Sequence, residues 1–285
     1  MKQFIIAILA IWILASCEDV IEVETPSEPP RLIVDGIIKI DTTESFTTAR
    51  IKITTSSSFF EDNTPVSVDL VRIQNFDYVP EFPLEANFIT LGEVEPGVYE
   101  GGKNTRFFTE GRLDLYVNYN EERYYASATF VPTSPIDSLE QGTETLFSDE
   151  ETEIIVSFTD NGERNDFYIL DFDFNEYLVT EDEFYQGQRF EFSYFYDNKL
   201  EAGTELNISI LGADEPFYNY MNQLIVQSGN NQGPFQTPVA TVRGNVFNVT
   251  GIDNNEVFDN AERTNNFALG YFAVVEEYKA RITIQ

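Results

Sequence analysis

Apolar and polar residues alternate along many short stretches of the chain, and this period of two predicts β-strands. The strands predicted in the first half are 32–38, 49–55, 65–73, 112–117 and 123–131. Glu95-Pro96-Gly97 is a strong turn signal between them, and the polar residues 118–122 predict a hairpin between the last two strands. Short strands that are regularly spaced and separated by turns are typical of a β-sandwich.

The second half continues the β pattern. The strands predicted there are 153–158, 167–177, 188–196, 205–211, 267–275 and 280–284. In the stretch 167–177, Ile169, Asp171 and Asp173 share one face, whereas Tyr168 and Leu170 share the other. This pattern predicts one strand with one face in a core and one face in water.

One segment has helical spacing instead. Asp214 is a good N-cap, and Pro216 suits the first turn of a helix. Apolar side chains then recur three and four residues apart up to Gly229, at positions Phe217, Tyr220, Met221, Leu224 and Ile225. We therefore expect a helix near 214–228 that packs on a sheet.

The best domain boundary is Pro132-Thr133-Ser134-Pro135, because proline disfavours ladder pairing and the prolines favour an extended connector. The prediction is a mostly β protein of two β-sandwich-like (Ig-like) domains, 31–131 and 132–285, the second of which carries the helix near 214–228.

The first residues have the pattern of a secretory signal. Lys2 precedes the apolar run Phe4–Leu14, and small residues follow it, so we interpret 1–16 as a signal peptide. The apolar run is about half of the roughly 20 residues that span a bilayer, which argues against the alternative of a transmembrane helix.

The ending Leu14-Ala15-Ser16-Cys17 resembles the lipobox of bacterial lipoproteins, and the resemblance implies lipid attachment at Cys17. An ordinary signal followed by a chance cysteine is the other alternative. Residues 17–30, acidic and then proline-rich, predict a tether.

The composition excludes several classes of function. Asp and Glu number 49 against 17 Lys and Arg, and the net charge of −32 argues strongly against nucleic-acid binding. Because 25 Phe and 15 Tyr accompany this charge, we expect a folded chain and not a disordered one. The chain has no histidine and only one cysteine, so Ser-His-Asp triads and zinc sites built on His or Cys are absent.

No catalytic residue, cofactor or metal ligand is assigned from the sequence. Calcium at the acidic face of 167–177, which carries Asp171 and Asp173, is an alternative because hard cations bind clustered carboxylates. Consecutive acids on a strand are nevertheless unlike the compact loop that calcium sites use.

Several short motifs resemble one family, and they occur in that family's order along nearly the whole chain after Cys17. These motifs are Val34-Asp35-Gly36, Pro65–Val68, Phe158-Thr159-Asp160, Asn165–Tyr168, Asp182-Glu183-Phe184, Gly187–Phe190, Gly203-Thr204, Tyr218–Tyr220, Gly244-Asn245 and Ala268–Phe272. The chain resembles the Bacteroidota lipoprotein group called domain of unknown function 4249. It departs from the group in 233–243, which is poorer in proline than the group's corresponding stretch.

The resemblance implies an outer-membrane lipoprotein, often encoded beside a TonB-dependent receptor and without known enzymatic activity. Glu18 and Asp19 after the cysteine resemble acidic export signals for the cell surface, although a plain solvated tether is the alternative. We expect a non-catalytic binding or accessory module, anchored in the bilayer through acylated Cys17, that partners an outer-membrane β-barrel transporter. A structural, adhesin-like or envelope-assembly role is the main alternative, and a carboxylate hydrolase is a weaker one.

Replacing Cys17 with serine tests the anchor. We expect the native chain to lack residues 1–16 and to carry acyl chains, whereas Cys17→Ser should keep the leader and carry none. Mass spectrometry of the two purified proteins measures both properties. An unmodified sulfur in the native protein would refute the anchor and every role built on it.

Overall fold

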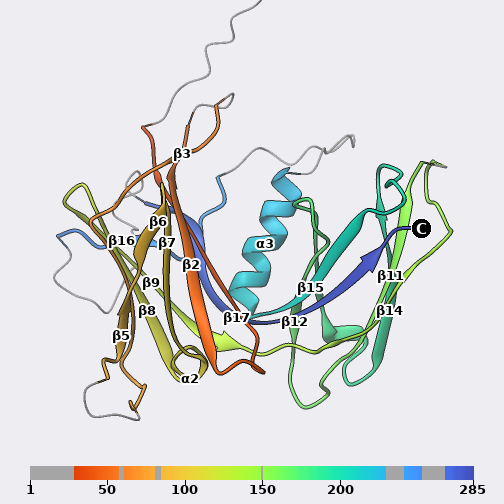
Figure 1. Ribbon diagram of the computed structural model, residues 1–285, viewed down its shortest axis with the longest axis horizontal. Helices are drawn as coiled ribbons and strands as arrows, with labels where there is room; N and C mark the ends of the chain where they lie inside the picture. The colour runs from red at the N-terminus through yellow and green to blue at the C-terminus, as the bar shows by residue number, and fades with distance from the viewer. Residues whose placement is uncertain (1–28, 58–60, 81–84, 149, 229–240, 252–266) are drawn as a thin grey trace, which may run out of the picture.

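The computed structural model of the chain describes residues 29–57, 61–80, 85–148, 150–228, 241–251 and 267–285. The signal segment, Cys17 and most of the tether lie outside these residues, as does the stretch 233–240. Strands dominate the described part, in which only two α-helices occur, so the mostly β class is confirmed (Figure 1).

The elements of the first half are β-strands with one short helix that closes an end of their core. They are β1 (Leu32–Ile40), β2 (Phe46–Thr55), β3 (Thr64–Pro65), β4 (Leu70–Asn75), β5 (Phe88–Thr90), β6 (Gly92–Glu95), β7 (Val98–Asn104), α2 (Thr105–Thr109), β8 (Arg112–Tyr119) and β9 (Glu122–Val131). The predicted hairpin is confirmed, since β8 and β9 pair antiparallel around Asn120 and Glu121 in left-handed conformation.

The elements of the second half include the long helix and the longest strand. They are β10 (Ile136–Gln141), β11 (Thr152–Thr159), β12 (Phe167–Asp171), β13 (Tyr177–Glu181), the 3-10 helix η1 (Asp182–Phe184), β14 (Arg189–Tyr196), β15 (Glu205–Ala213), α3 (Glu215–Ser228), β16 (Phe247–Asn248) and β17 (Leu269–Thr283). The helix predicted near 214–228 is confirmed by α3.

Strand β17 belongs to the sheets of both halves. Its residues 269–276 pair parallel with β1, and Val274 and Val275 also pair parallel with β9. From Glu277 onward the strand pairs antiparallel with β15 instead. The strand order β5-β4-β8-β9-β17-β1-β2-β7-β6 is thereby continued through β15 to β12 and β13. In Figure 1, β17 runs from the left half of the molecule into the right half.

Three hydrophobic clusters account for the layers. The sheet of the first half curls around one core that α2 closes with Phe107 and Phe108. In the second half, the three-stranded sheet β10-β11-β14 packs on β12, β15 and the end of β17 around another core. The third cluster lies on the opposite face of β12 and β15, which α3 covers with Phe217 and Met221.

The strand predicted over 167–177 is wrong in two respects. Residues 173–175 are left-handed, with φ between 50° and 66°, so the stretch folds into the hairpin β12–β13. The sequence does not mark this turn, because the apolar alternation continues up to the buried Phe172 and no glycine or proline interrupts the stretch. The face of Ile169 is also not in water, since this residue is fully buried beneath α3.

The two strands predicted at 267–275 and 280–284 are one strand. The acidic pair Glu276-Glu277 ends the apolar run, but it marks the place where β17 changes partners and not a turn. Pro132–Pro135 connects β9 to β10 and belongs to no strand or helix. The domain limits 31–131 and 132–285 stay a prediction, since β17 completes the sheet of the first half.

Hydrogen bonds and ion pairs hold the crossing of β17. Glu276 accepts hydrogen bonds from the backbone N–H of Thr133 at 2.8 Å and from the hydroxyl of Thr42 at 2.7 Å. Lys39 on β1 lies 3.3 Å from Glu277 and 3.1 Å from Asp171 of β12. Burial by itself would lower the pKa of Lys39. The carboxylates of Glu277 and Asp171 together have a larger effect in the opposite direction, so the pKa of Lys39 is raised. The two halves are therefore joined by charges as well as by the strand.

Replacing Gly270 tests how closely β17 must approach β1. Gly270 has φ +90°, and a Cβ there would lie 2.0 Å from the carbonyl oxygen of Val34. We expect Gly270→Ala to lower the free energy of unfolding by about 3–5 kcal/mol, through strain and overpacking. Gly92→Ala is the matched control, because a Cβ at Gly92 meets nothing within 4 Å. Urea unfolding followed by circular dichroism measures both, and equal stability of the two variants would contradict this account.

Candidate functional site

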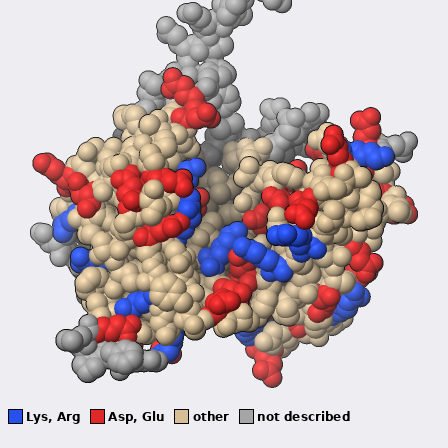
Figure 2. All heavy atoms as spheres, viewed as in Figure 1, with Lys and Arg blue, Asp and Glu red and all other residues tan. Residues whose placement is uncertain are grey.

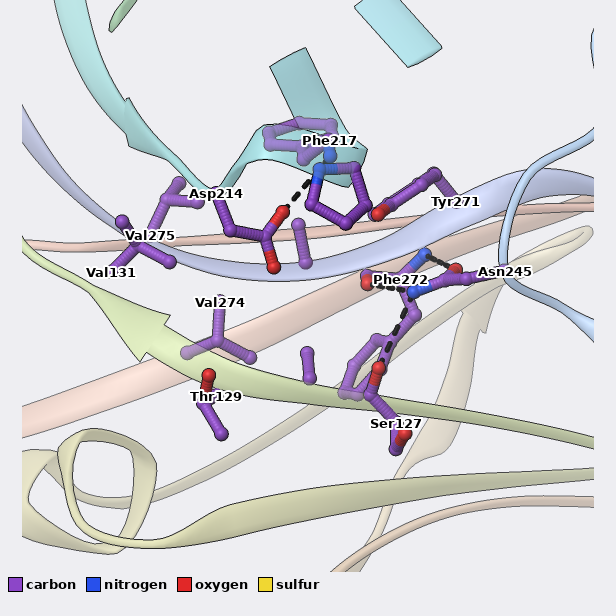
Figure 3. A pocket seen from close by; sticks show the side chains of 13 residues that line it. Ser127, Thr129, Val131, Asp214, Phe217, Asn245, Tyr271, Phe272, Val274 and Val275 are labelled. Atoms are coloured by element: carbon purple, nitrogen blue, oxygen red, sulfur yellow. Dashed lines mark hydrogen bonds between the residues drawn. The ribbon is translucent and has the colours of Figure 1, made fainter. Parts of the chain in front are cut away.

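The N-terminus of α3 is fixed at the junction between the two halves. The backbone carbonyl of Asp214 accepts the first helical hydrogen bond, from Tyr218 N–H at 2.9 Å. Its Oδ1 atom accepts a second one, from Phe217 N–H at 2.9 Å, so Asp214 is the N-cap that the sequence predicts (Figure 3). The rings of Phe217 and Tyr220 then lie 4.9 and 4.7 Å from that of Tyr271 on β17. These contacts set the first turn of α3 against β17.

Asn245 attaches the segment 241–251 to the same strand. Its amide oxygen accepts from Phe272 N–H at 2.8 Å, and its amide nitrogen donates to the Phe272 carbonyl at 2.8 Å and the Ser127 carbonyl at 3.3 Å. The Asn245 side chain makes the backbone hydrogen bonds to β17 that a neighbouring strand would otherwise make, and it also bonds to β9 (Figure 3). All three bonds go to the backbone, so the role of Asn245 is to position this segment.

Two glycines allow three backbones to stack beside Asn245. A Cβ on Gly244 would lie 1.6 Å from the carbonyl oxygen of Gly270, and a Cβ on Gly270 would lie 2.0 Å from that of Val34. Only glycine fits both positions. The motifs Gly244-Asn245 and Gly270-Tyr271-Phe272 are thus brought together by the fold, and their shared function is architectural.

A small cleft lies between these elements, with a volume of about 220 Å³. It is lined by residues of β9, β17 and the start of α3 together with Asn245, namely Ser127, Ala128, Thr129, Val131, Asp214, Pro216, Phe217, Asn245 and Tyr271–Val275. Val131 and Val275 contribute apolar wall, whereas Thr129 and Asp214 are exposed polar residues. Such a cleft, mostly apolar with a few polar groups, is the usual form of a small-molecule site.

The polar groups of the cleft decide which ligands would fit it. Asp214 uses Oδ1 for the helix cap, and Figure 3 shows its second carboxylate oxygen directed toward Val274, where a ligand donor could reach it. Burial raises the pKa of Tyr271, so this phenol stays protonated at neutral pH. Asp214 is the single acid among the lining residues, and it has no second carboxylate beside it there. The cleft suits an uncharged or cationic ligand with hydrogen-bond donors.

The acids proposed for calcium do not share a site. Asp171 pairs with Lys39, while Asp173 accepts hydrogen bonds from the backbone and side chain of Asn207. Within the described ranges, no group of three or more His, Cys, Asp and Glu side chains is arranged to hold a metal ion. The left-handed turn at 173–175 ends the single strand on which the sequence pattern placed both carboxylates.

The lipid-attachment residue Cys17 lies outside the described residues. Among those that are described, no helix has both the length and the apolarity to span a bilayer. The cleft itself carries no signal in the sequence, because its walls come from four separate segments. The nearest indications were the helix cap at Asp214 and the motif residues Asn245 and Tyr271.

Removing the side chain of Asn245 tests its positioning role. We expect Asn245→Ala to destabilise the fold by about 2–4 kcal/mol, because it leaves backbone groups of Phe272 and Ser127 without their partners. The control Asn198→Ala removes an exposed amide and should change stability by less than about 0.5 kcal/mol. Urea unfolding measures the difference, and a loss below 1 kcal/mol for Asn245→Ala would contradict the role.

Comparison with known families gives one match. The model of the family described as Domain of unknown function (DUF4249) matches residues 18–255, a stretch that begins directly after Cys17 and ends before β17. No curated protein matches the chain. The matched stretch includes Gly244 and Asn245 and most of both halves of the fold. Because the match covers well over half of the sequence, the chain belongs to the DUF4249 family.

Proposed function

We propose that this protein is a lipid-anchored outer-membrane lipoprotein, exposed on the cell surface, that binds ligands without catalysis and assists a TonB-dependent receptor in ligand capture or uptake. The sequence support is the signal pattern of 1–16, the lipobox-like ending at Cys17 and the acids that follow it. Two acyl chains are enough for stable anchoring without a membrane-spanning segment.

The cleft at the start of α3 is the observation that carries a binding role. Its walls are preformed, because Asn245 is bonded to two strands and Asp214 caps the helix. A site with fixed walls binds without a large ordering cost, so even a small ligand can gain useful affinity there. The volume of about 220 Å³ limits the occupant to a small molecule or to one group of a larger ligand.

The distribution of charge supports attachment to the membrane through acyl chains. It does not support attachment through the protein's own surface. Figure 2 shows acidic side chains over both halves, with one group of Lys and Arg where the halves meet and others spread over the outer parts of this face. A net charge of −32 repels phosphate groups of lipids and of nucleic acids. We therefore propose neither nucleic-acid binding nor adsorption to anionic headgroups.

The crossing of β17 favours the second candidate, a structural or adhesin-like lipoprotein with no small ligand. The strand passes through both halves, and Lys39 links β1 to Asp171 and Glu277 across the same junction. A protein built in this way resists bending between its halves, which is the property that a spacer or an assembly factor needs.

Affinity purification from native membranes tests the proposed partner, and a cleft variant tests the ligand role. We expect a large β-barrel protein to copurify with the wild-type chain in mild detergent, and Thr129→Phe to keep that partner because it changes one side chain of the cleft and leaves the rest of the surface as it is. Thr129→Phe should also abolish growth on whichever nutrient a deletion strain cannot use, since it fills the cleft.

Thr145→Phe adds the same ring to an exposed loop away from the cleft and is the control. Repeated recovery of the chain alone would contradict the receptor partnership. A deletion strain with normal growth but altered attachment or envelope integrity would favour the structural role over uptake.

A further inference from the structure

A second and larger depression lies toward the other end of α3 from the cleft. Its volume is about 480 Å³, and its walls are the C-terminal half of α3, the β12–β13 turn and the end of β14. The lining residues are Asn175, Glu176, Tyr177, Tyr194, Phe195, Asp197, Met221, Leu224, Ile225 and Ser228. We call this depression the α3 groove. Figure 1 shows α3 beside the β12–β13 hairpin that forms one of its walls.

Aromatic rings form much of the groove. Tyr177, Tyr194 and Phe195 are all half-buried, so part of each ring remains accessible. Tyr194 is held in place by stacking on the buried Phe172, with ring centroids 3.9 Å apart and planes 11° apart. On the helix side, Leu224 and Ile225 complete the apolar wall. Three aromatic residues therefore line the groove, and one of them is fixed by stacking.

The charged groups in the groove have one sign. Glu176 and Asp197 are its only ionisable side chains besides the tyrosines, and none of the described lining residues is Lys or Arg. Oε2 of Glu176 accepts a hydrogen bond from the Tyr194 hydroxyl, whereas its Oε1 makes none within the described part of the chain. Burial first, and this hydrogen bond second, raise the pKa of Tyr194, so the phenol remains a neutral donor. No basic side chain among the lining residues therefore offsets the two carboxylates, and the nearest basic group that acts on the groove is Lys39, behind Tyr177.

A costly backbone conformation places Glu176. Asp173, Phe174 and Asn175 are three successive left-handed residues that are not glycine, each of which costs on the order of 1–2 kcal/mol. The turn is closed by hydrogen bonds from Phe172 N–H to the Glu176 carbonyl at 2.8 Å and from Glu176 N–H to the Asp173 carbonyl at 2.9 Å. Its effect is to end β12 early and to direct Glu176 toward Tyr194.

We propose that the α3 groove binds an organic cation with an apolar body, such as an aromatic or alkyl amine. The apolar part lies against Leu224, Ile225 and the aromatic rings. The cationic group lies over the faces of Tyr177 or Phe195, where the ring quadrupole attracts it, and near the carboxylates of Glu176 and Asp197. The surrounding charge of the protein, −32 in total, raises the local concentration of cations and repels anions.

Three probes of nearly the same shape test the charge requirement on the full chain. They are phenethylammonium, the neutral 2-phenylethanol and the anionic 3-phenylpropionate, titrated while the NMR signals of Met221 and of residues 175–177 are followed. We expect saturable shifts for phenethylammonium, binding of the alcohol at least about tenfold weaker, and none for the anion. The affinity for the cation should also fall as salt rises from 20 to 500 mM, since added ions screen the carboxylates.

Two variants test the assigned carboxylates independently. Glu176→Gln keeps an acceptor for Tyr194 but removes the charge, and Asp197→Asn changes an exposed residue outside the strained turn. Each should weaken binding of phenethylammonium about fivefold. Glu140→Gln is the control on β10, at the opposite edge of the sheet from β14, and should leave binding within twofold.

The proposal is overturned if 2-phenylethanol binds as tightly as phenethylammonium, or if Asp197→Asn and a folded Glu176→Gln both bind the cation like the wild type. Saturable binding of a neutral oligosaccharide that displaces the cation at equal or higher affinity would also overturn it. These outcomes are independent of the receptor partnership, because the titrations use the chain alone.

Discussion

The structure depends on the burial of two adjacent carboxylates at the place where β17 leaves one sheet and enters another. An unpaired carboxylate in such a position would cost several kcal/mol. Glu276 instead receives hydrogen bonds from Thr133 and Thr42, and Glu277 is paired with Lys39 and Lys279. In a chain with nearly three acids for each basic residue, these donors are scarce. The junction between the halves is thus fixed by polar groups that match only in one register.

Helix α3 lines two depressions beside this junction. Its buried residues Phe217 and Met221 hold it against β12, β15 and β17. Its N-terminal turn forms one wall of the cleft, and its C-terminal half forms one wall of the α3 groove. The two depressions differ in chemistry, since the cleft has a single acid beside a mostly apolar wall, whereas the groove combines aromatic faces with two acids. One helix therefore contributes to two depressions of different chemical character.

Local sequence patterns were sufficient to predict much of the fold, but they predicted little of the cleft and of the α3 groove. The alternation of apolar residues and the cap at Asp214 predicted most strands and α3, because period and capping are local properties. The same alternation failed at 167–177, where left-handed residues reverse the chain without glycine, and at Glu276, where a change of partner resembles a strand end. Both depressions assemble from segments far apart in sequence, so no local signal could place them. Asn245 was identified only as part of a family motif, and its three backbone hydrogen bonds explain that motif.

The parallel pairing of β1 with β17 also has a consequence for how the chain reaches its folded form. Ile33 pairs with Leu269, so the first strand must wait for a partner more than two hundred residues further along the polypeptide. Contacts of such long range slow folding, because loop closure precedes any gain from pairing. A polypeptide that emerges from its N-terminus onward cannot complete its first sheet until nearly all of it has appeared. This delay leaves the edges of β1 and β9 dependent on protection until β17 arrives.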